Sequence, residues 1–243
     1  FNNLEAGSFS ETTTASFSAD LAIGAVDGNT ETNGTEALTT GYSFQIDLNT
    51  SFTGEDSLDI SLDAGNADDG SLDILDLNDS GDTLKVDGVA YTFPIGDKTT
   101  VFVGDNMDGS TLYNTACVYG GQTIQLDDCG NSGAAMAAGA GTAAGASYDF
   151  GNGFTAAIGY EGNPTGLMTK EGYDVFGGQL TYTGDAYGVS VTYSDYESST
   201  QADTTYTAIN AYYTPEGAGS LPSISAGYEA GTVTGATDTS QWM

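Results

Sequence analysis

The chain has 243 residues, enough for one domain with a sizeable core or for a closed barrel. It carries 34 acidic residues against three lysines (Lys85, Lys98 and Lys170) and no histidine, for a net charge of -31, which excludes nucleic acid and anionic membrane surfaces as electrostatic partners. A hydrophobic content of 39%, with 15 Tyr and 10 Phe, excludes a disordered chain. No apolar stretch reaches about 18 residues, so the chain can span a membrane only as a closed β-barrel.

Alternation of apolar and polar residues, the pattern of a β-strand, begins at Thr14. Up to Ala25, Phe17 and Leu21 share one face while Asp20 lies on the other. Similar alternation predicts strands around residues 44–49, 58–63, 89–94, 99–104, 154–160, 176–182, 187–193 and 223–229, a strand at 204–214 whose faces cannot be assigned, and a last strand starting near Gln241. This makes eleven or twelve strands of about ten residues, the length that crosses a bilayer when tilted by ~45°.

Two all-β architectures fit this alternation: a water-soluble sandwich with one face buried, and a membrane barrel whose apolar face points outward. The barrel is favoured because Asp occurs in mid-strand on the polar faces, which suits a water-filled interior, and because no helical periodicity interrupts the strands. Aromatic residues also gather at strand ends, as at a membrane interface. They are Phe52, Tyr160, Tyr182, Tyr187, Tyr193, Tyr213 and Tyr228. We therefore expect an antiparallel transmembrane β-barrel.

Residues 105–146 show no alternation and are expected to form one long loop, which in a barrel either folds inward as a constriction or caps the outside. The segment contains Cys117 and Cys129, with no further Cys or His nearby. A metal site needs more ligands of this kind, so we expect a disulfide and an oxidising compartment. The Ala-rich run 134–145 favours a short helix, which Gly139 and Gly141 oppose.

Five segments, taken in order, resemble cyanobacterial outer-membrane porins of the carbohydrate-selective, OprB-type family, with marine picocyanobacterial members the most similar in character. The resemblance covers nearly the whole chain. It is carried by residues 1–14 (FNNLEAGSFSETTT), 42–54 (YSFQIDLNTSFTG), 91–96 (YTFPIG), 145–150 (GASYDF) and 176–179 (FGGQ).

This resemblance implies a 16-stranded, trimeric pore for passive diffusion of small hydrophilic solutes and inorganic ions across the outer membrane. Residues 1–243 would be the porin barrel domain, covering about the first 11–12 strands and incomplete at the C-terminus. Family members also carry an N-terminal S-layer homology domain and a coiled coil that hold the barrel to peptidoglycan, and we expect these outside the present sequence. Sugar-selective members have basic residues at the pore constriction, whereas this chain has no arginine.

Four carboxylates fall on the polar strand faces and are candidates for lining the pore: Asp20, Asp47, Asp59 and Asp63. Rings of Asp in contact with water favour cations over anions, which predicts a cation-preferring pore. The alternative is that these residues only hydrate the wall.

Four acids of the long loop are candidates for the constriction itself: Asp105, Asp108, Asp127 and Asp128. The Cys117–Cys129 bridge would stiffen such a constriction. In the alternative, the loop is an extracellular cap with no influence on selectivity.

An Asp-rich stretch resembles the spacing of an EF-hand calcium loop, with Asp76, Asn78, Ser80 and Asp87 as the candidate ligands. Ser80 at the fifth position, Asp87 in place of Glu and the absence of flanking helices instead favour a solvated turn. We expect no required cofactor, although Ca²⁺ binding is compatible with this stretch.

Enzymatic interpretations lack a His base and a phosphate-binding loop with its Lys, so we expect no enzyme. The competing function from another class is a secreted, acidic, calcium-binding surface or adhesion protein with a β-sandwich core. A barrel whose main role is to anchor the outer membrane is a third possibility.

Overall fold

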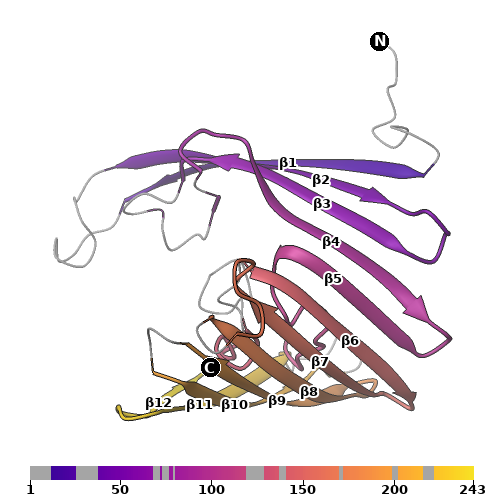
Figure 1. Ribbon diagram of the computed structural model, residues 1–243. Helices are drawn as coiled ribbons and strands as arrows, with labels where there is room; N and C mark the ends of the chain where they lie inside the picture. Colours follow the sequence, from indigo (N-terminus) through magenta and orange to yellow (C-terminus); the bar gives the residue numbers. More distant parts are fainter. Residues whose placement is uncertain are drawn as a thin grey trace. The chain divides into compact units, whose positions relative to one another are not determined.

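The computed structural model describes residues 12–25, 38–67, 72, 77–78, 80–118, 129–136, 141–169, 172–198, 202–215 and 222–243. Within them the chain forms twelve β-strands, and each strand is the sheet neighbour of the next strand in the sequence (Figure 1). Every pair with a defined register is antiparallel, as predicted. No helix in the described ranges is both long enough and apolar enough to cross a membrane.

The chain divides into two compact units, with the boundary between Tyr91 and Thr92 in β4 (Lys85–Ile95). Unit 1 contains β1 (Thr13–Gly24), β2 (Thr39–Thr50), β3 (Ser57–Gly65) and the first part of β4. Its pairing puts Phe17 opposite Ile46, which in turn faces Leu62. On the other face Ser16 lies opposite Asp47, which faces Ser61. The apolar and polar faces predicted for these three strands are therefore confirmed.

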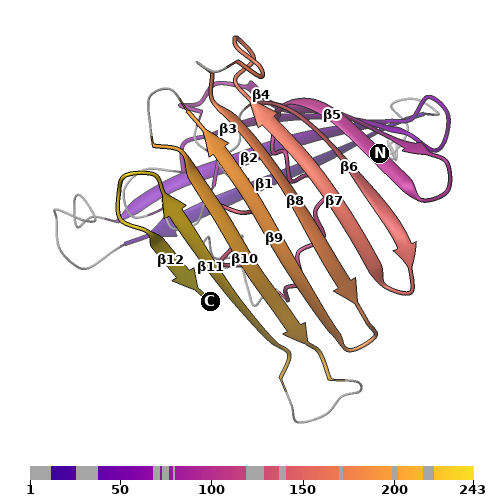
Figure 2. The ribbon, with the colours of Figure 1, turned by 60° about the horizontal axis from the view of Figure 1, so that its bottom comes forward.

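Unit 2 holds the remaining strands, which lie side by side in chain order (Figure 2). Tight connections such as 152–153 and 184–186 alternate with longer ones such as 163–173. Asn152 and Gly153 both have positive φ, 55° and 84°, as an Asn-Gly hairpin turn requires. The strands are β5 (Thr99–Met107), β6 (Gly141–Gly151), β7 (Phe154–Gly162), β8 (Asp174–Thr183), β9 (Tyr187–Glu197), β10 (Thr204–Tyr213), β11 (Ile224–Val233) and β12 (Thr239–Trp242).

Strand β6 corrects the prediction of an unbroken loop over 105–146. β5 continues to Met107, and Gly141 to Ala146 pair with it, so the connection is 108–140. The expected helix is also wrong for its last part, because Gly141–Gly145 is strand. Alternation is invisible here because Gly and Ala occupy both faces. The large side chain of Phe102, fully buried, covers Gly145 instead.

The faces of unit 2 are inverted relative to a water-soluble sheet. In β9, Tyr187, Val189, Val191 and Tyr193 are exposed, while the residue that follows each of them is buried: Gly188, Ser190, Thr192 and Ser194. Neighbouring strands repeat this pattern: Ile158 is 66% exposed, whereas Asn210 is buried. We call these the bare apolar face and the covered polar face. A water-soluble sandwich buries its apolar face, so the alternative of a sandwich is not supported.

Two belts of aromatic side chains border the bare apolar face. Each of β7, β8 and β9 carries two aromatic residues six positions apart, about 20 Å along a strand. Phe154 contacts Tyr182 in one belt, with 4.8 Å between ring centroids, and Tyr160 contacts Phe176 in the other, with 5.0 Å. Aliphatic residues fill the space between. An apolar band flanked by aromatic girdles is typical of a sheet embedded in a lipid bilayer.

The β2–β3 turn is organised by one buried carboxylate, Asp56. One of its oxygens accepts hydrogen bonds from the backbone amides of Phe52 and Thr53, at 3.0 and 2.7 Å, and from the Ser51 hydroxyl. The other accepts from the Tyr91 hydroxyl, at 2.6 Å. These donors favour the ionised form, so the pKa of Asp56 lies well below its usual range, with the Tyr91 hydrogen bond as the largest cause.

We predict that Asp56→Asn lowers the thermal midpoint of the folded protein near neutral pH. A depressed pKa contributes stability above the unfolded-state value, near pH ~4, and loses it as pH falls further. The difference in midpoint between the native chain and Asp56→Asn should therefore shrink below about pH 4. Circular dichroism melts at both pH values test this, and a difference that grows on acidification would contradict it.

Candidate functional site

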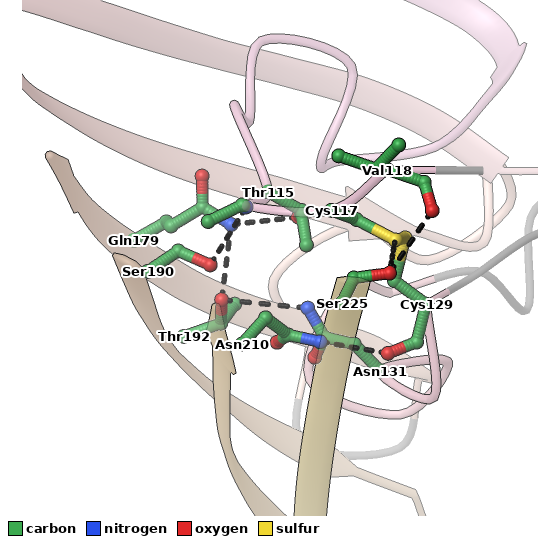
Figure 3. Close-up of a disulfide and its surroundings, with 11 residues drawn as sticks. Thr115, Cys117, Val118, Cys129, Asn131, Gln179, Ser190, Thr192, Asn210 and Ser225 are labelled. Carbon is green, nitrogen blue, oxygen red and sulfur yellow. Dashed lines mark hydrogen bonds between the residues drawn. A yellow bond between two sulfur atoms is a disulfide. The ribbon is translucent and has the colours of Figure 1, made fainter. Parts of the chain in front are cut away.

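The loop 108–140, here called the long loop, is described over 108–118 and 129–136. Both described segments lie against the covered polar face of unit 2, and Figure 3 shows their central part. These contacts are with the covered polar face and not with the bare apolar face. Several buried polar side chains of β7 to β11 form hydrogen bonds with this loop: Glu161, Gln179, Ser190, Asn210 and Glu229.

The first segment binds strands β7, β8 and β9 in turn. The Gly109 amide donates to the Glu161 carboxyl, at 3.2 Å. The Asn114 amide then donates to Gln179 Oε1, at 2.6 Å, and the Ala116 amide donates to Ser190 Oγ, at 2.9 Å. We call strands β7 to β11 the wall. Three successive strands of the wall therefore supply one acceptor each for the loop backbone.

The second segment binds strands β10 and β11. Asn210 Nδ2 donates to the Cys129 carbonyl, at 2.7 Å. The two oxygens of Glu229, a side chain only 3% exposed, accept from the backbone amides of Gly133 and Ala134, at 3.3 and 2.7 Å. Tyr196 of β9 also donates to the Gly133 carbonyl, at 2.7 Å. A buried glutamate therefore accepts hydrogen bonds from the loop backbone at each end of the contact, Glu161 at one end and Glu229 at the other.

Cys117 and Cys129 are joined by a disulfide, which connects the two docked segments (Figure 3). A neutral hydrogen bond contributes about 1 kcal/mol net, and one to a charged group about 1.5–3 kcal/mol. Closing a loop of this size with a disulfide contributes about 3 kcal/mol in the chain-entropy model. The disulfide is therefore as strong a restraint on the loop as several of its individual hydrogen bonds.

Glycines on the wall let the loop backbone approach closely. A Cβ on Gly159 would overlap the carbonyl oxygen of Gly109 and lie 2.9 Å from the Met136 methyl group. One on Gly227 would lie 2.5 Å from the Cys129 carbonyl oxygen. The loop therefore lies in van der Waals contact with the wall, at positions where no other residue type fits without displacing it.

Three buried polar atoms of this interface have no hydrogen-bond partner in the described part of the chain. They are the Tyr113 hydroxyl, Asn131 Oδ1 and Asn210 Oδ1. Burial raises the pKa of Tyr113, so its hydroxyl stays neutral. Desolvating such atoms costs free energy. The remaining hydrogen bonds and the disulfide must offset this cost to keep the loop on the wall.

The four predicted pore-lining acids belong to unit 1 and share its polar face. The register puts Asp20 opposite Ser43 and Asp59 opposite Asn49, on the same side as Asp47 and Asp63. Asp47 accepts hydrogen bonds from Gln45, at 2.7 Å, and from the hydroxyls of Ser61 and Ser16. These acids are exposed or half-buried, unlike Glu161 and Glu229 of unit 2.

The predicted constriction acids are not all where the sequence suggested. Asp105 lies in β5, not in the loop, and its carboxylate accepts from Thr142 of β6. It shares the face of Val103, which is exposed, so it cannot belong to a constriction on the polar face. Asp108 begins the loop and is half-buried. Asp127 and Asp128 lie outside the described residues.

Three of the four candidate calcium ligands lie in the described residues: Asn78, Ser80 and Asp87. The Asn78 backbone amide donates to the Ser43 hydroxyl of β2. The Ser80 hydroxyl accepts from the backbone amide of Gly65, at the end of β3, at 3.1 Å. Asp87 lies in β4, and Asp76 is outside the described residues. No group of three or more His, Cys, Asp or Glu able to hold a metal occurs in the described ranges.

Sequence reasoning missed the residues that hold the loop. These are Glu161, Gln179, Ser190, Asn210, Ser225 and Glu229. Strand parity places Glu161, Gln179 and Ser190 on polar faces, but nothing in the sequence distinguishes a wall residue that meets solvent from one that meets the loop. That distinction depends on the path of the loop.

No protein-family model matches the chain, and no curated protein matches it. The solved structures it resembles include porins of Rhodopseudomonas blastica. One engineered variant of that porin is 8% identical, with 95% of this chain and 87% of that chain covered and a TM-score of 0.45. A structure titled as engineered proteins of asymmetric conductivity is also 8% identical, with 95% and 86% covered and a TM-score of 0.42.

We predict that Gly159→Ala displaces the first loop segment, because the added methyl group occupies the position of the Gly109 carbonyl. Hydrogen exchange over residues 108–118 should become faster than in the native chain. The matched control is Gly178→Ala on the bare face, where the atom nearest to the new methyl group is the Ala157 oxygen, at 3.3 Å, and no loop atom lies close. Equal exchange in the two variants would show that the loop does not rest on Gly159.

Proposed function

We propose that the chain forms part of the wall of a bacterial outer-membrane channel of the porin type, through which small hydrophilic solutes and inorganic ions diffuse passively. The observation that carries this proposal is the inversion of the faces in unit 2. Apolar residues bordered by aromatic belts are exposed, while Ser, Thr, Asn and Gln are covered. Both faces are stable when the apolar face meets lipid outside a barrel and the polar face points to its water-filled interior.

A closed barrel follows from the backbone. In a bilayer every amide and carbonyl must be paired internally, so a sheet of membrane-spanning strands must join its own edges. Strands β1 to β11 have 9 to 12 residues each, the length that such a crossing needs. We infer that further strands complete the barrel, and the resemblance to the cyanobacterial porins implies 16 in all.

The long loop is the proposed constriction. It lies on the polar face, is fixed to five successive strands from β7 to β11, and is held against wall glycines. A loop fixed in this way narrows the water-filled passage. It is the element that sets the largest solute able to pass.

The proposed selectivity is for cations. The acids that bind the loop, Glu161 and Glu229, are buried, whereas Asp47, Asp59 and Asp63 remain accessible on the polar face of unit 1. The described lysines lie at the ends of one strand, since Lys85 begins β4 and Lys98 lies in the β4–β5 turn. Accessible Asp side chains that outnumber the basic residues favour cations over anions.

The finer parts of the proposal come from the family resemblance. We infer a homotrimer in a cyanobacterial outer membrane, held to peptidoglycan by a domain outside residues 1–243. Inorganic ions are preferred over sugars as the solutes, because the chain lacks the arginines expected at a sugar-selective constriction.

We predict that the full-length protein, reconstituted in a planar bilayer, gives ion-conducting channels whose reversal potential in a salt gradient indicates cation preference. Replacing Asp59 and Asp63 together by Asn should shift that potential toward zero, because two accessible charges leave the polar face. The matched control is Glu55→Gln in the exposed β2–β3 turn, which should leave the potential unchanged.

Anion preference of the native protein would refute the cation selectivity while leaving the channel in place. A complete lack of conductance in the protein, after successful insertion into the bilayer, would refute the channel itself.

A further inference from the structure

The disulfide connects two segments that are docked on different strands of the wall. On the Cys117 side, the Ala116 amide donates to Ser190 of β9 and the Val118 carbonyl accepts from Ser225 of β11, both at 2.9 Å (Figure 3). On the Cys129 side, the Cys129 carbonyl accepts from Asn210 of β10. While the disulfide is intact, neither segment can leave its strands without pulling on the other.

The hydrogen bonds that would remain near Cys117 and Cys129 without the disulfide are individually weak. The hydrogen bonds around the two sulfurs come from neutral Ser, Thr and Asn side chains, each of which water can replace. Asn131 Oδ1 and Asn210 Oδ1 gain partners if the interface opens to water. Cys129 also holds a left-handed backbone, with φ of 54°, that a non-glycine residue adopts unfavourably. Release of the segment relieves both penalties.

The two cysteine residues differ in exposure. Cys129 is 1% exposed, whereas Cys117 is half-buried and its sulfur lies 3.9 Å from the Ser225 hydroxyl. A thiolate of a small dithiol therefore attacks the Cys117 sulfur, forming a mixed disulfide and releasing the Cys129 thiolate. The second thiol of the reductant then closes its own cyclic disulfide and releases Cys117. Two electrons pass from the dithiol to the protein, which gains two thiols.

From these contacts we propose that the Cys117–Cys129 disulfide is a redox-sensitive clip: reduction by a dithiol releases residues 108–118 and 129–136 of the long loop from the wall, and oxidation restores their contacts. The release is a property of the loop contacts alone. Its consequence, a wider and less uniform passage, rests on the proposed channel function.

The experiment compares the full-length protein in detergent before and after dithiothreitol, by hydrogen exchange over 108–118 and 129–136. We expect faster exchange in both segments after reduction and no change in the wall strand β9. The Cys117→Ser, Cys129→Ser double variant should show the fast exchange without reductant and no further response to it. Single-channel recording in a bilayer then gives the second readout, a loss of the single conductance level on reduction.

Unchanged exchange in the loop of the reduced protein would overturn the proposal. Faster exchange in β9 as well would also overturn it, because the disulfide would then stabilise the whole wall instead of clipping the loop. If the protein forms no channels in either state but the loop exchange responds as expected, the clip stands and the proposed channel function fails.

Discussion

The structure depends on one constraint: in unit 2 the apolar face of the sheet is exposed and the polar face is covered. In unit 2 the exposed side chains are Val, Ile, Leu and aromatic residues, and the covered ones are Ser, Thr, Asn and Gln. In water this arrangement loses the hydrophobic stabilisation that ordinarily holds a sheet domain together. In a bilayer the same arrangement is favourable, and the backbone pairing of the strands becomes the main restraint. The aromatic belts, the strand lengths and the polar wall all follow from that one inversion.

The carboxylates of the polar strand faces fall into two groups, those that bind the long loop and those that remain accessible. Glu161 and Glu229 are buried and bind backbone amides of the long loop, so they act as attachment points. Asp47, Asp59 and Asp63 are accessible, and their partners, where they have them, are neutral side chains such as Gln45 and Asn49. A carboxyl group buried under the loop is not in contact with ions in solution. The proposed selectivity therefore comes from the second group.

Much of the strand pattern could be predicted from the sequence, because the two faces of each strand differ in polarity. Tyr187 to Tyr193 alternate without exception, and the observed strand follows them. β6 could not be predicted, since Gly141 to Ala146 have small side chains on both faces, and the faces of β10 become clear only from the burial of Ala208 and Asn210.

Within the site, the disulfide could be predicted because Cys117 and Cys129 are the two cysteines of the chain. The position of Asp105 could not, because the visible alternation stops at Gly104 while the strand continues to Met107. The attachment residues on the wall, Glu161 and Glu229 among them, could not be predicted either. Their role depends on the path of a loop whose contacts are mostly made by its backbone, which leaves no pattern in the side chains.

Lipid contact of the bare apolar face can be measured directly with the one tryptophan of the 243-residue sequence. Trp242 pairs with Tyr228, lies on the bare face and is 83% exposed. In vesicles that contain the protein, its fluorescence should be quenched by lipids brominated on their acyl chains near the headgroups and protected from acrylamide in the water. Strong quenching by acrylamide, with no effect of the brominated lipids, would show that this face meets water and would contradict a membrane-embedded wall.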